Sequence, residues 1–211
     1  MGQGVSLSEV FAGPAGDAAA LGFVLAQREG RSGPILWVQD RLSRRETGRP
    51  CLPGLGERPS PVMLLEVGRA ADVLAAAEEG LRCPALSGVI IEIWGDPPAL
   101  GFTATKRLAL RAEETGVPCW LIRHGGAAGL SAARDRWRVT ALPSAAHPDD
   151  ARAPGDPRWR IELFRSRDKR PGLWVGRHDR LAARLDLAAA PQADGLQPIQ
   201  GVAKPLASAA R

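Results

Sequence analysis

The sequence predicts an α/β fold: a mainly parallel sheet with helices on both faces, followed by an antiparallel β-meander towards the C-terminus. Three observations lead to this prediction. Short apolar runs alternate with segments of helical periodicity up to Arg123, which is the rhythm of β-α-β units. One run, Gly88–Ile93, is almost continuously apolar, as expected for a central parallel strand that is buried on both faces. After Gly125, three strand patterns follow one another without long helices between them.

The first elements follow in order from the N-terminus. Ser8–Ala12 is an apolar strand, and Asp17–Glu29 repeats apolar residues at helical spacing, with Gly30 placed to end the helix. Pro34–Val38 has the pattern of a buried strand. The stretch 41–61 is rich in Pro, Gly and Arg, so we expect a loop there.

Three strands and two helices complete this part of the chain: Val62–Val67, Arg69–Leu81, Gly88–Ile93, Thr103–Thr115 and Pro118–Arg123. In the first of these helices Val73, Leu74 and Ala77 share one face, which we expect to pack on the sheet. Gly116 is placed to end the second helix.

The rest of the chain has a different organisation. Gly125–Leu130 is a loop of small residues, and Pro143–Pro157 is a polar loop. Strands are expected at Arg134–Leu142, Arg158–Arg167 and Leu173–His178. We therefore expect a single domain over residues 1–187, and a disordered tail rich in Ala, Pro, Gln and Gly over residues 188–211.

The composition is that of a globular protein and excludes several classes. The chain has 211 residues, 45% of them hydrophobic and 24% charged, which suits one domain with a sizeable core. No apolar run is long enough to cross a membrane and no secretion signal is visible, so we expect a cytoplasmic protein with no membrane partner. Cys51, Cys83 and Cys119 are far apart and the three histidines are scattered, which argues against a metal site or a disulfide framework. Cys119 lies in an apolar run and is expected to be buried.

The turn after the first strand resembles a phosphate-binding loop that has lost its chemistry. The pattern G-x-x-x-x-G-K-[ST] can be counted from Gly13, with Gly16 inside the loop. Ala18, Ala19 and Ala20 then hold the positions of the second glycine, the lysine and the hydroxyl residue. Hydrogen bonds from such charged groups are worth roughly 1.5–3 kcal/mol each, so their loss should remove tight nucleotide binding. The alternative is an ordinary strand–turn–helix unrelated to a phosphate site.

Two carboxylates are relevant to whether this turn can bind a nucleotide. Asp17 stands just before the helix, where an N-cap carboxylate bonds free N–H groups and would repel a phosphate. Glu92 ends an apolar strand, as in a Walker-B strand, where an acid orients Mg²⁺ or its water. Without the lysine this acid has no role in hydrolysis, although it can serve as a hydrogen-bond acceptor for a neighbouring loop. We therefore expect no enzyme activity and no cofactor.

Positive charge is concentrated late in the chain. Residues 134–184 contain twelve arginines and one lysine against seven acids, a net charge of +6. In two Arg-Trp-Arg strands, Trp137 and Trp159 alternate with arginines and should face the core. The opposite face either is a solvated surface or forms a ridge that binds DNA or an acidic partner. The residues proposed for this basic ridge are Arg134, Arg136, Arg138, Arg158, Arg160, Arg165, Arg167, Lys169 and Arg170.

The order of these elements resembles the core of RecA, and within that superfamily the chain most resembles the ImuA family of SOS mutagenesis cassettes. The segments that carry the resemblance are Gly48–Leu55, Thr103–Leu110, Ser131–Val139 and Pro157–Leu163. The resemblance implies a RecA-like three-layer core. The N-terminal extension that RecA uses to polymerise is not expected here. The loops that correspond to the DNA-holding loops of RecA are short, at Gly95–Gly101 and Gly125–Leu130.

The resemblance also implies a function in the response to DNA damage. ImuA-like proteins are non-catalytic accessory factors of translesion synthesis, which act with ImuB, an inactive relative of Y-family polymerases, and with an error-prone polymerase. They are also thought to contact RecA, which implies a nucleoid-associated location. A SulA-like inhibitor of cell division that binds FtsZ is the alternative. An active NTPase would need one of Lys106, Lys169 and Lys204 to reach the loop. In the tail, Gln197–Leu206 is either a docking motif or plain unstructured chain.

Overall fold

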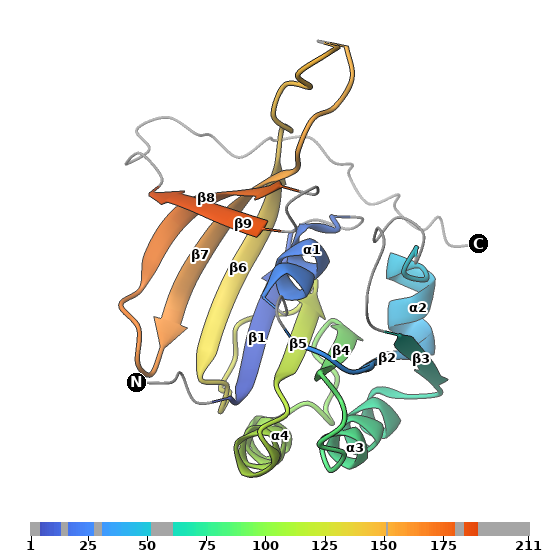
Figure 1. Ribbon diagram of the computed structural model, residues 1–211. Helices are drawn as coiled ribbons and strands as arrows, with labels where there is room; N and C mark the ends of the chain where they lie inside the picture. The colour runs from blue at the N-terminus through green and yellow to red at the C-terminus, as the bar shows by residue number, and fades with distance from the viewer. Residues whose placement is uncertain are drawn as a thin grey trace, which may run out of the picture.

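The protein forms one nine-stranded sheet with helices on both sides (Figure 1). We describe a computed structural model over residues 5–13, 17–27, 31–51, 61–150, 152–179 and 184–189. The strands are β1 (Leu7–Ala12), β2 (Ile35–Asp40), β3 (Val62–Val67), β4 (Gly88–Trp94), β5 (Cys119–His124), β6 (Asp135–Leu142), β7 (Arg158–Ser166), β8 (Gly172–Asp179) and β9 (Arg184–Ala189). The helices are α1 (Ala19–Ala26), α2 (Arg41–Thr47), α3 (Ala70–Gly80) and α4 (Phe102–Thr115).

The sheet has a parallel and an antiparallel part. Its strand order is β3-β2-β4-β5-β1-β6-β7-β8-β9, and all neighbours from β3 to β6 run parallel. The pairs β6–β7, β7–β8 and β8–β9 are antiparallel. The mainly parallel α/β sheet with an antiparallel C-terminal part therefore agrees with the prediction from the sequence.

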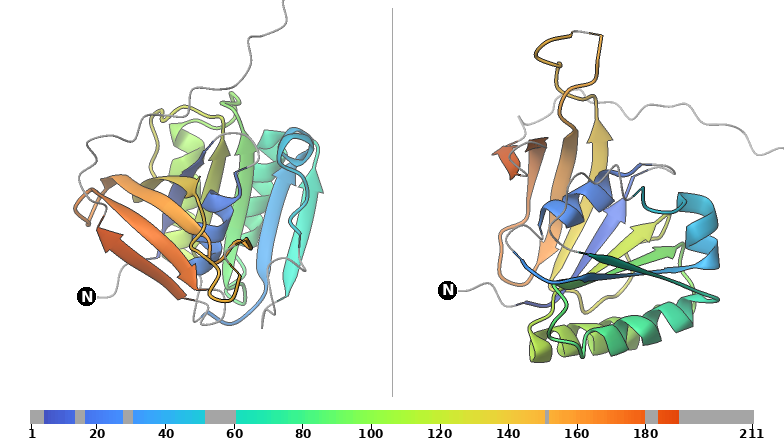
Figure 2. Two further views of the ribbon diagram at one scale, coloured as in Figure 1. Left: turned by 90° about the horizontal axis from the view of Figure 1, so that it is seen from above. Right: turned by 45° about the vertical axis from the view of Figure 1, so that its right-hand side comes forward.

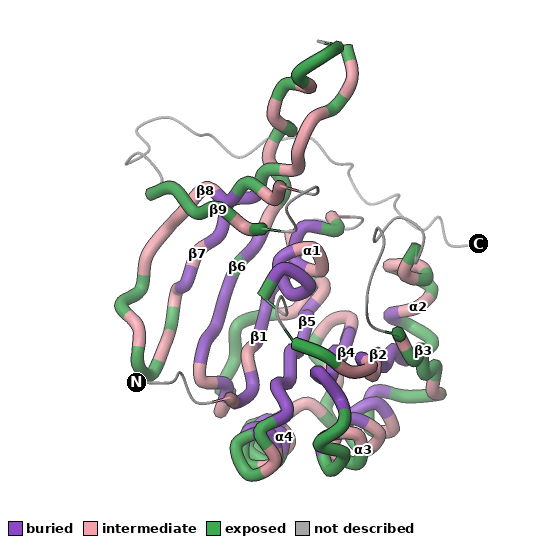
Figure 3. The backbone as a smooth tube through the Cα atoms, viewed as in Figure 1, coloured by how far each residue is buried: buried purple, intermediate pink, exposed green. Residues whose placement is uncertain are grey.

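Two apolar clusters lie on opposite faces of the sheet. On one face, α3 and α4 pack on β2, β4 and β5, and Val73, Ala77 and Ile91 are fully buried there. On the other face, α1 packs on a cluster that contains Trp37, Trp137 and Trp159. Figure 2 shows α3 and α4 side by side beneath the sheet, with α1 above it. In Figure 3 the buried positions concentrate in the central strands, whereas the edge strand β3 is largely exposed.

Close contact between α1 and the antiparallel part depends on a glycine. A Cβ atom on Gly22 would lie 2.5 Å from the indole ring of Trp159, so a larger residue would push the helix away from β7. Gly116, at the end of α4, has a φ of 72°, in the left-handed region that favours glycine as a helix stop. The helix stop predicted at Gly116 is therefore confirmed.

The structure corrects the sequence-based prediction at two elements. The expected loop 41–61 begins with α2, because Asp40 caps this helix by accepting the N–H of Ser43 at 2.7 Å. The rest of that loop, 52–60, lies outside the described residues. A fourth C-terminal strand, β9, pairs with β8 and includes Ala188 and Ala189, which were assigned to the tail. Residues 190–211, and with them the candidate motif Gln197–Leu206, are not among those described.

Candidate functional site

The carboxylate of Asp17 closes the turn between β1 and α1. Its Oδ1 atom accepts the backbone N–H of Ala19 at 2.8 Å, at the start of α1. Its Oδ2 atom accepts the backbone N–H of Ala141, in β6, also at 2.8 Å. A Cβ atom on Gly13 would lie 2.5 Å from this Oδ2 atom and would displace the carboxylate. The prediction that Asp17 bonds an N–H at the start of the helix is confirmed, whereas its bond to β6 was not foreseen.

The first two residues of α1, Ala19 and Ala20, have only methyl side chains. Ala19 and Ala20 are 3% and 0% exposed and pack in the same cluster as Phe23. In an intact phosphate-binding motif a lysine and a hydroxyl residue would stand at these two positions. Gly16, also singled out in the sequence, lies outside the described residues. The described residues of this turn and first helical turn therefore present a carboxylate and apolar groups where a phosphate would need cations and free N–H groups.

Glu92 is a buried hydrogen-bond acceptor at the C-terminal end of β4. Its Oε1 atom accepts the indole N–H of Trp37 at 2.6 Å. Its Oε2 atom lies 2.8 Å from Nε2 of His124 and accepts the Thr47 hydroxyl at 3.4 Å. The indole ring of Trp94 stacks on His124, with ring centroids 6.1 Å apart. Glu92 thus joins β2, α2 and β5. It is a hydrogen-bond acceptor as predicted, but its partners lie on two strands and a helix rather than in a neighbouring loop.

The sequence analysis missed a second buried carboxylate, that of Glu9. It is 1% exposed and lies between two arginines on the neighbouring strands. Arg123 donates to Oε1 at 3.0 Å, and Arg136 donates to Oε2 at 2.7 Å. Both guanidinium groups also lie over the ring of Phe11, at 5.6 and 5.4 Å from its centroid. An acid inside an apolar strand was the available signal, because a buried carboxylate requires a cation or several donors.

The buried triad of Glu9, Arg123 and Arg136 corrects the assignment of Arg136 to an exposed basic ridge. Arg136 is 3% exposed and its charge is matched by Glu9, so it is not accessible to a partner. Arg123 extends the triad by donating to the carbonyl of Gly95 at 3.0 Å and to the carboxylate of Asp96. Asp96 in turn accepts the N–H of Ala127. The two short loops after β4 and β5 are therefore tied together over the buried arginine.

Two further basic residues are held by acids at the N-terminal end of β6. Arg134 donates to Asp168 and, at 3.3 Å, to Glu113, and the hydrogen bond with Asp168 raises the pKa of Arg134. The Nζ atom of Lys169 lies 2.6 Å from a carboxylate oxygen of Asp135. These ion pairs connect the β7–β8 turn and α4 to β6. The positive charges of Arg134 and Lys169 are therefore largely matched within the chain.

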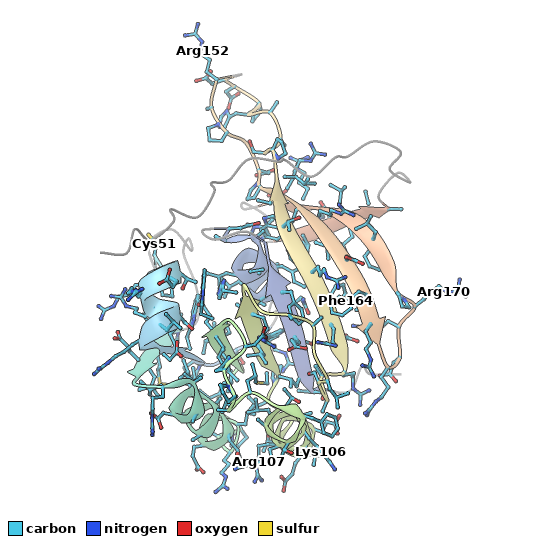
Figure 4. The ribbon with its side chains drawn as sticks, turned by 180° about the vertical axis from the view of Figure 1, so that it is seen from behind. Cys51, Lys106, Arg107, Arg152, Phe164 and Arg170 are labelled. Atoms are coloured by element: carbon cyan, nitrogen blue, oxygen red, sulfur yellow. The ribbon has the colours of Figure 1, made fainter. Side chains whose placement is uncertain are left out.

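The other basic residues predicted for the ridge are exposed. Arg138 donates to Glu162 at 3.2 Å and its guanidinium lies 4.1 Å from the ring centroid of Phe164. The remaining basic residues of the predicted ridge have no ion-pair partner within the described part of the chain. They are Arg158, Arg160, Arg165, Arg167 and Arg170. Figure 4 shows Phe164 on the sheet face opposite α1 and Arg170 projecting from the β7–β8 turn. Six of the nine predicted positions thus remain candidates for contact with a partner.

Large exposed apolar side chains gather elsewhere on the molecule. On the edge strand β3, Met63, Leu64 and Leu65 are all at least 40% exposed. A hollow beside this strand is lined by Trp37, Gln39, Arg44, Arg49, Leu64, Leu65 and Glu66. Three further exposed apolar side chains, those of Phe102, Leu110 and Leu130, belong to α4 and to the loop after β5. Exposed apolar patches of this kind are typical of surfaces that bind other proteins.

The described part of the chain has neither a candidate metal site nor a candidate membrane span. No group of three or more His, Cys, Asp and Glu side chains is placed to hold a metal ion there. Every helix within the same residues is too short or too polar to span a bilayer.

Comparison with known proteins identifies relatives of this chain. The chain is 33% identical to the protein ImuA of Caulobacter vibrioides strain NA1000 over 177 aligned residues, which cover 79% of this chain and 68% of the relative. The ImuA of a second strain, ATCC 19089, matches with the same identity and coverage. No model of a protein family matches the sequence.

Proposed function

The chain belongs to the ImuA family, and we propose that it is a non-catalytic accessory protein of bacterial SOS mutagenesis. In this proposal it is an adaptor that binds an ImuB-like protein, contacts RecA, and supports an error-prone polymerase in translesion synthesis. Its core would be a RecA-like scaffold that no longer hydrolyses ATP.

One observation supports the non-catalytic part of the proposal, in which the carboxylate of Asp17 takes the place of a phosphate. Asp17 bonds the N–H of Ala19 at the start of α1, which is the group a phosphate would use. An incoming phosphate would meet this negative charge without a lysine to offset it. Glu92, at the position of a Walker-B acid, is already engaged by Trp37, His124 and Thr47. Both features favour a platform rather than an ATPase.

The exposed apolar residues support a role in protein binding. Stable protein interfaces are built around apolar and aromatic anchors. Met63, Leu64 and Leu65 offer such anchors on an edge strand, whose outer backbone groups have no strand neighbour within the described sheet. We propose that a protein partner docks on β3 or on α4, at Phe102 and Leu110.

The decisive experiment compares three partners side by side. Purified protein would be used to capture the ImuB-like protein, RecA and FtsZ. The proposal expects retention of the ImuB-like protein and RecA, and weaker retention when Leu64→Asp or Leu110→Asp is introduced. Arg45→Glu, on the exposed side of α2, is the control that should bind as the unmodified protein does. Retention of FtsZ alone would replace the proposal with a SulA-like function.

Nucleotide binding provides an independent test of the non-catalytic part. Titration calorimetry with ATP and Mg²⁺ should show no binding and no turnover. Micromolar affinity would overturn the claim that Asp17 blocks the site. The position of the gene beside genes for a Y-family-like protein and an error-prone polymerase would agree with the proposed partners.

A further inference from the structure

One face of the antiparallel part of the sheet is left uncovered by any described helix. Alternation along β7 sends Trp159, Ile161 and Leu163 into the cluster beneath α1. Residues between them point to the other side, where α3 and α4 contact the strands from β1 to β5. The outward residues of β6 and β7 that form this uncovered face are Arg138, Thr140, Arg158, Arg160, Glu162 and Phe164.

The uncovered face has positive charge that the described chain does not neutralise. Arg158 and Arg160 are exposed and have no acidic partner among the described residues. In the register of the sheet, Arg158 lies opposite Arg177, whose guanidinium is bonded to Asp156 at 2.7 Å. Asp186 lies opposite Arg177 on the other neighbouring strand, so the charge of Arg177 is matched within the chain, whereas that of Arg158 is not.

The same face has a planar stacking group. The Arg138 guanidinium lies 4.1 Å from the centroid of the Phe164 ring, and this ring in turn packs edge-on against Phe11 at 5.7 Å. Bases of single-stranded nucleic acids stack on aromatic rings and on arginine planes. Positive side chains combined with such a platform are the usual elements of a surface that binds single strands.

The face lacks what a protein partner would need. Large exposed apolar residues in the described chain belong to β3, α2, α4, the loop after β5, and Leu187. Leu187 lies opposite Gly176 and beside Leu185, which packs on the cluster beneath α1, so it belongs to the other side of the sheet. Charge without apolar anchors fits a polyanion better than a folded acidic protein.

A duplex fits the face less well than a single strand. Proteins read duplex DNA by inserting a helix or a two-stranded ribbon into the major groove. The segment that projects furthest here is the loop between β6 and β7, with Arg152 near its tip (Figure 4), and it also has Asp149 and Asp150. These two acids would be repelled by phosphates on either side of a groove.

We propose that the uncovered face of β6 and β7 binds the backbone of single-stranded nucleic acid through Arg158 and Arg160, with a base stacked at Arg138 and Phe164. The exposed side chains of Arg165, Arg167 and Arg170 continue the basic path towards the β7–β8 turn, at the opposite end of β7 from Arg152 (Figure 4). This inference deepens the proposed function, on which it rests, because an adaptor of translesion synthesis works beside single-stranded template.

Fluorescence anisotropy with a labelled oligothymidylate tests the inference. The double variant Arg158→Glu/Arg160→Glu should bind at least tenfold more weakly than the unmodified protein. Arg41→Glu/Arg45→Glu makes the same change of charge on α2, beside β2 and β3 at the far side of the sheet, and should bind nearly as the unmodified protein does. Equal losses in the two double variants would overturn the inference, because net charge alone would then explain the binding.

The salt dependence gives a second readout that does not require reversed charges. Each phosphate of a single strand that the protein neutralises releases counterions and contributes about 0.7 to the slope of log affinity against log salt. Arg158→Ala/Arg160→Ala should therefore lower that slope by about 1.4. An unchanged slope would show that neither arginine meets a phosphate. Circular dichroism of each variant, expected to match the unmodified protein, shows that the fold is intact.

Competition separates the other possible ligands. A duplex of the same length and polyglutamate should each displace the oligothymidylate much less effectively than unlabelled oligothymidylate does. Better competition by the duplex, or equal competition by polyglutamate, would overturn the assignment to single strands. Capture of the ImuB-like protein by Arg158→Glu/Arg160→Glu should be unchanged. If oligothymidylate does not bind while this capture succeeds, the inference fails and the proposed function stands.

Discussion

The carboxylate of Asp17 accepts the backbone N–H of Ala141 at 2.8 Å and so joins the turn after β1 to the strand β6. The two residues are 124 positions apart in the chain. Because the other carboxylate oxygen bonds Ala19 in the first turn of α1, a single side chain holds together a strand, a turn and a helix. The described residues of the segment that resembles a phosphate site therefore form a structural junction between α1 and β6.

Removal of this carboxylate should destabilise the protein. Asp17→Ala leaves the N–H groups of Ala19 and Ala141 without their acceptor, and we expect the free energy of unfolding to fall by about 1–3 kcal/mol. Urea denaturation measures the change. Asp150→Ala, which removes an exposed carboxylate bonded to the N–H of Arg152, should cost less than about 0.5 kcal/mol. Equal effects of the two variants would contradict the structural role of Asp17.

The Glu9 triad should be much more sensitive than any surface ion pair. Glu9→Gln leaves Arg136 buried without a counter-charge, and leaves Arg123 with only the partly exposed Asp96, so we expect a loss of about 3–5 kcal/mol in urea denaturation. Glu162→Gln breaks the exposed pair with Arg138 and should cost less than about 1 kcal/mol.

The double variant Glu9→Gln/Arg136→Met provides the check on this explanation. Because the second substitution removes the buried charge that Glu9→Gln leaves unmatched, part of the lost stability should return. Strictly additive losses would argue that the triad contributes by shape and packing rather than by charge.

The Glu92 carboxylate should contribute to stability through its donors. In Glu92→Leu the buried indole N–H of Trp37 loses its acceptor, and we expect a loss of about 1–3 kcal/mol. The indole proton of Trp37 should also shift in the NMR spectrum. Glu66→Leu removes an exposed acid near Arg44 and should alter neither quantity appreciably. An unperturbed Trp37 resonance in Glu92→Leu would refute the contact.

The three cysteines should differ in reactivity. Cys119 is fully buried, as the sequence predicts, and burial raises the pKa of its thiol. A raised pKa means less thiolate at a given pH, and the thiolate is the nucleophile. Iodoacetamide should therefore modify the exposed Cys51 and Cys83 in the native protein, and Cys119 only in urea. Mass spectrometry reads out each site, and native labelling of Cys119 at the same rate as Cys83 would contradict its burial.

Much of the fold follows from local pattern alone. The strand Val62–Val67 has the predicted bounds, and the helix α4 ends at Gly116 as expected. Prediction failed where local signals were weak. The helix α2 lies in a stretch rich in Arg and is capped by Asp40, and its buried Ser43 accepts the N–H of Trp94 at 2.9 Å. The composition of this stretch suits a loop as well as a short capped helix, and only packing against β4 decides between the two structures.

Part of the candidate site could also be predicted from local pattern. Strand alternation correctly separated Trp159, in the core, from Arg160, on the surface. It also separated Trp137 from Arg136, yet it could not show that Arg136 is buried, because the opposite face of a strand is exposed only if nothing covers it. Here Glu9 and Phe11 on the adjacent β1 cover it.

The amino-acid pattern alone was enough to predict the mainly parallel α/β class, most strand and helix positions, the absence of lysine and hydroxyl from the turn, and the excess of arginine near the C-terminus. These are local properties that are set by a few neighbouring residues. The meeting of Glu9 with Arg123 and Arg136, which are 114 and 127 positions away, is visible only in the folded chain. Such contacts depend on the order of strands in the sheet, which places β1 between β5 and β6. That order is settled by the packing of the whole chain, and it separates the arginines that hold the core from those that lie on the surface.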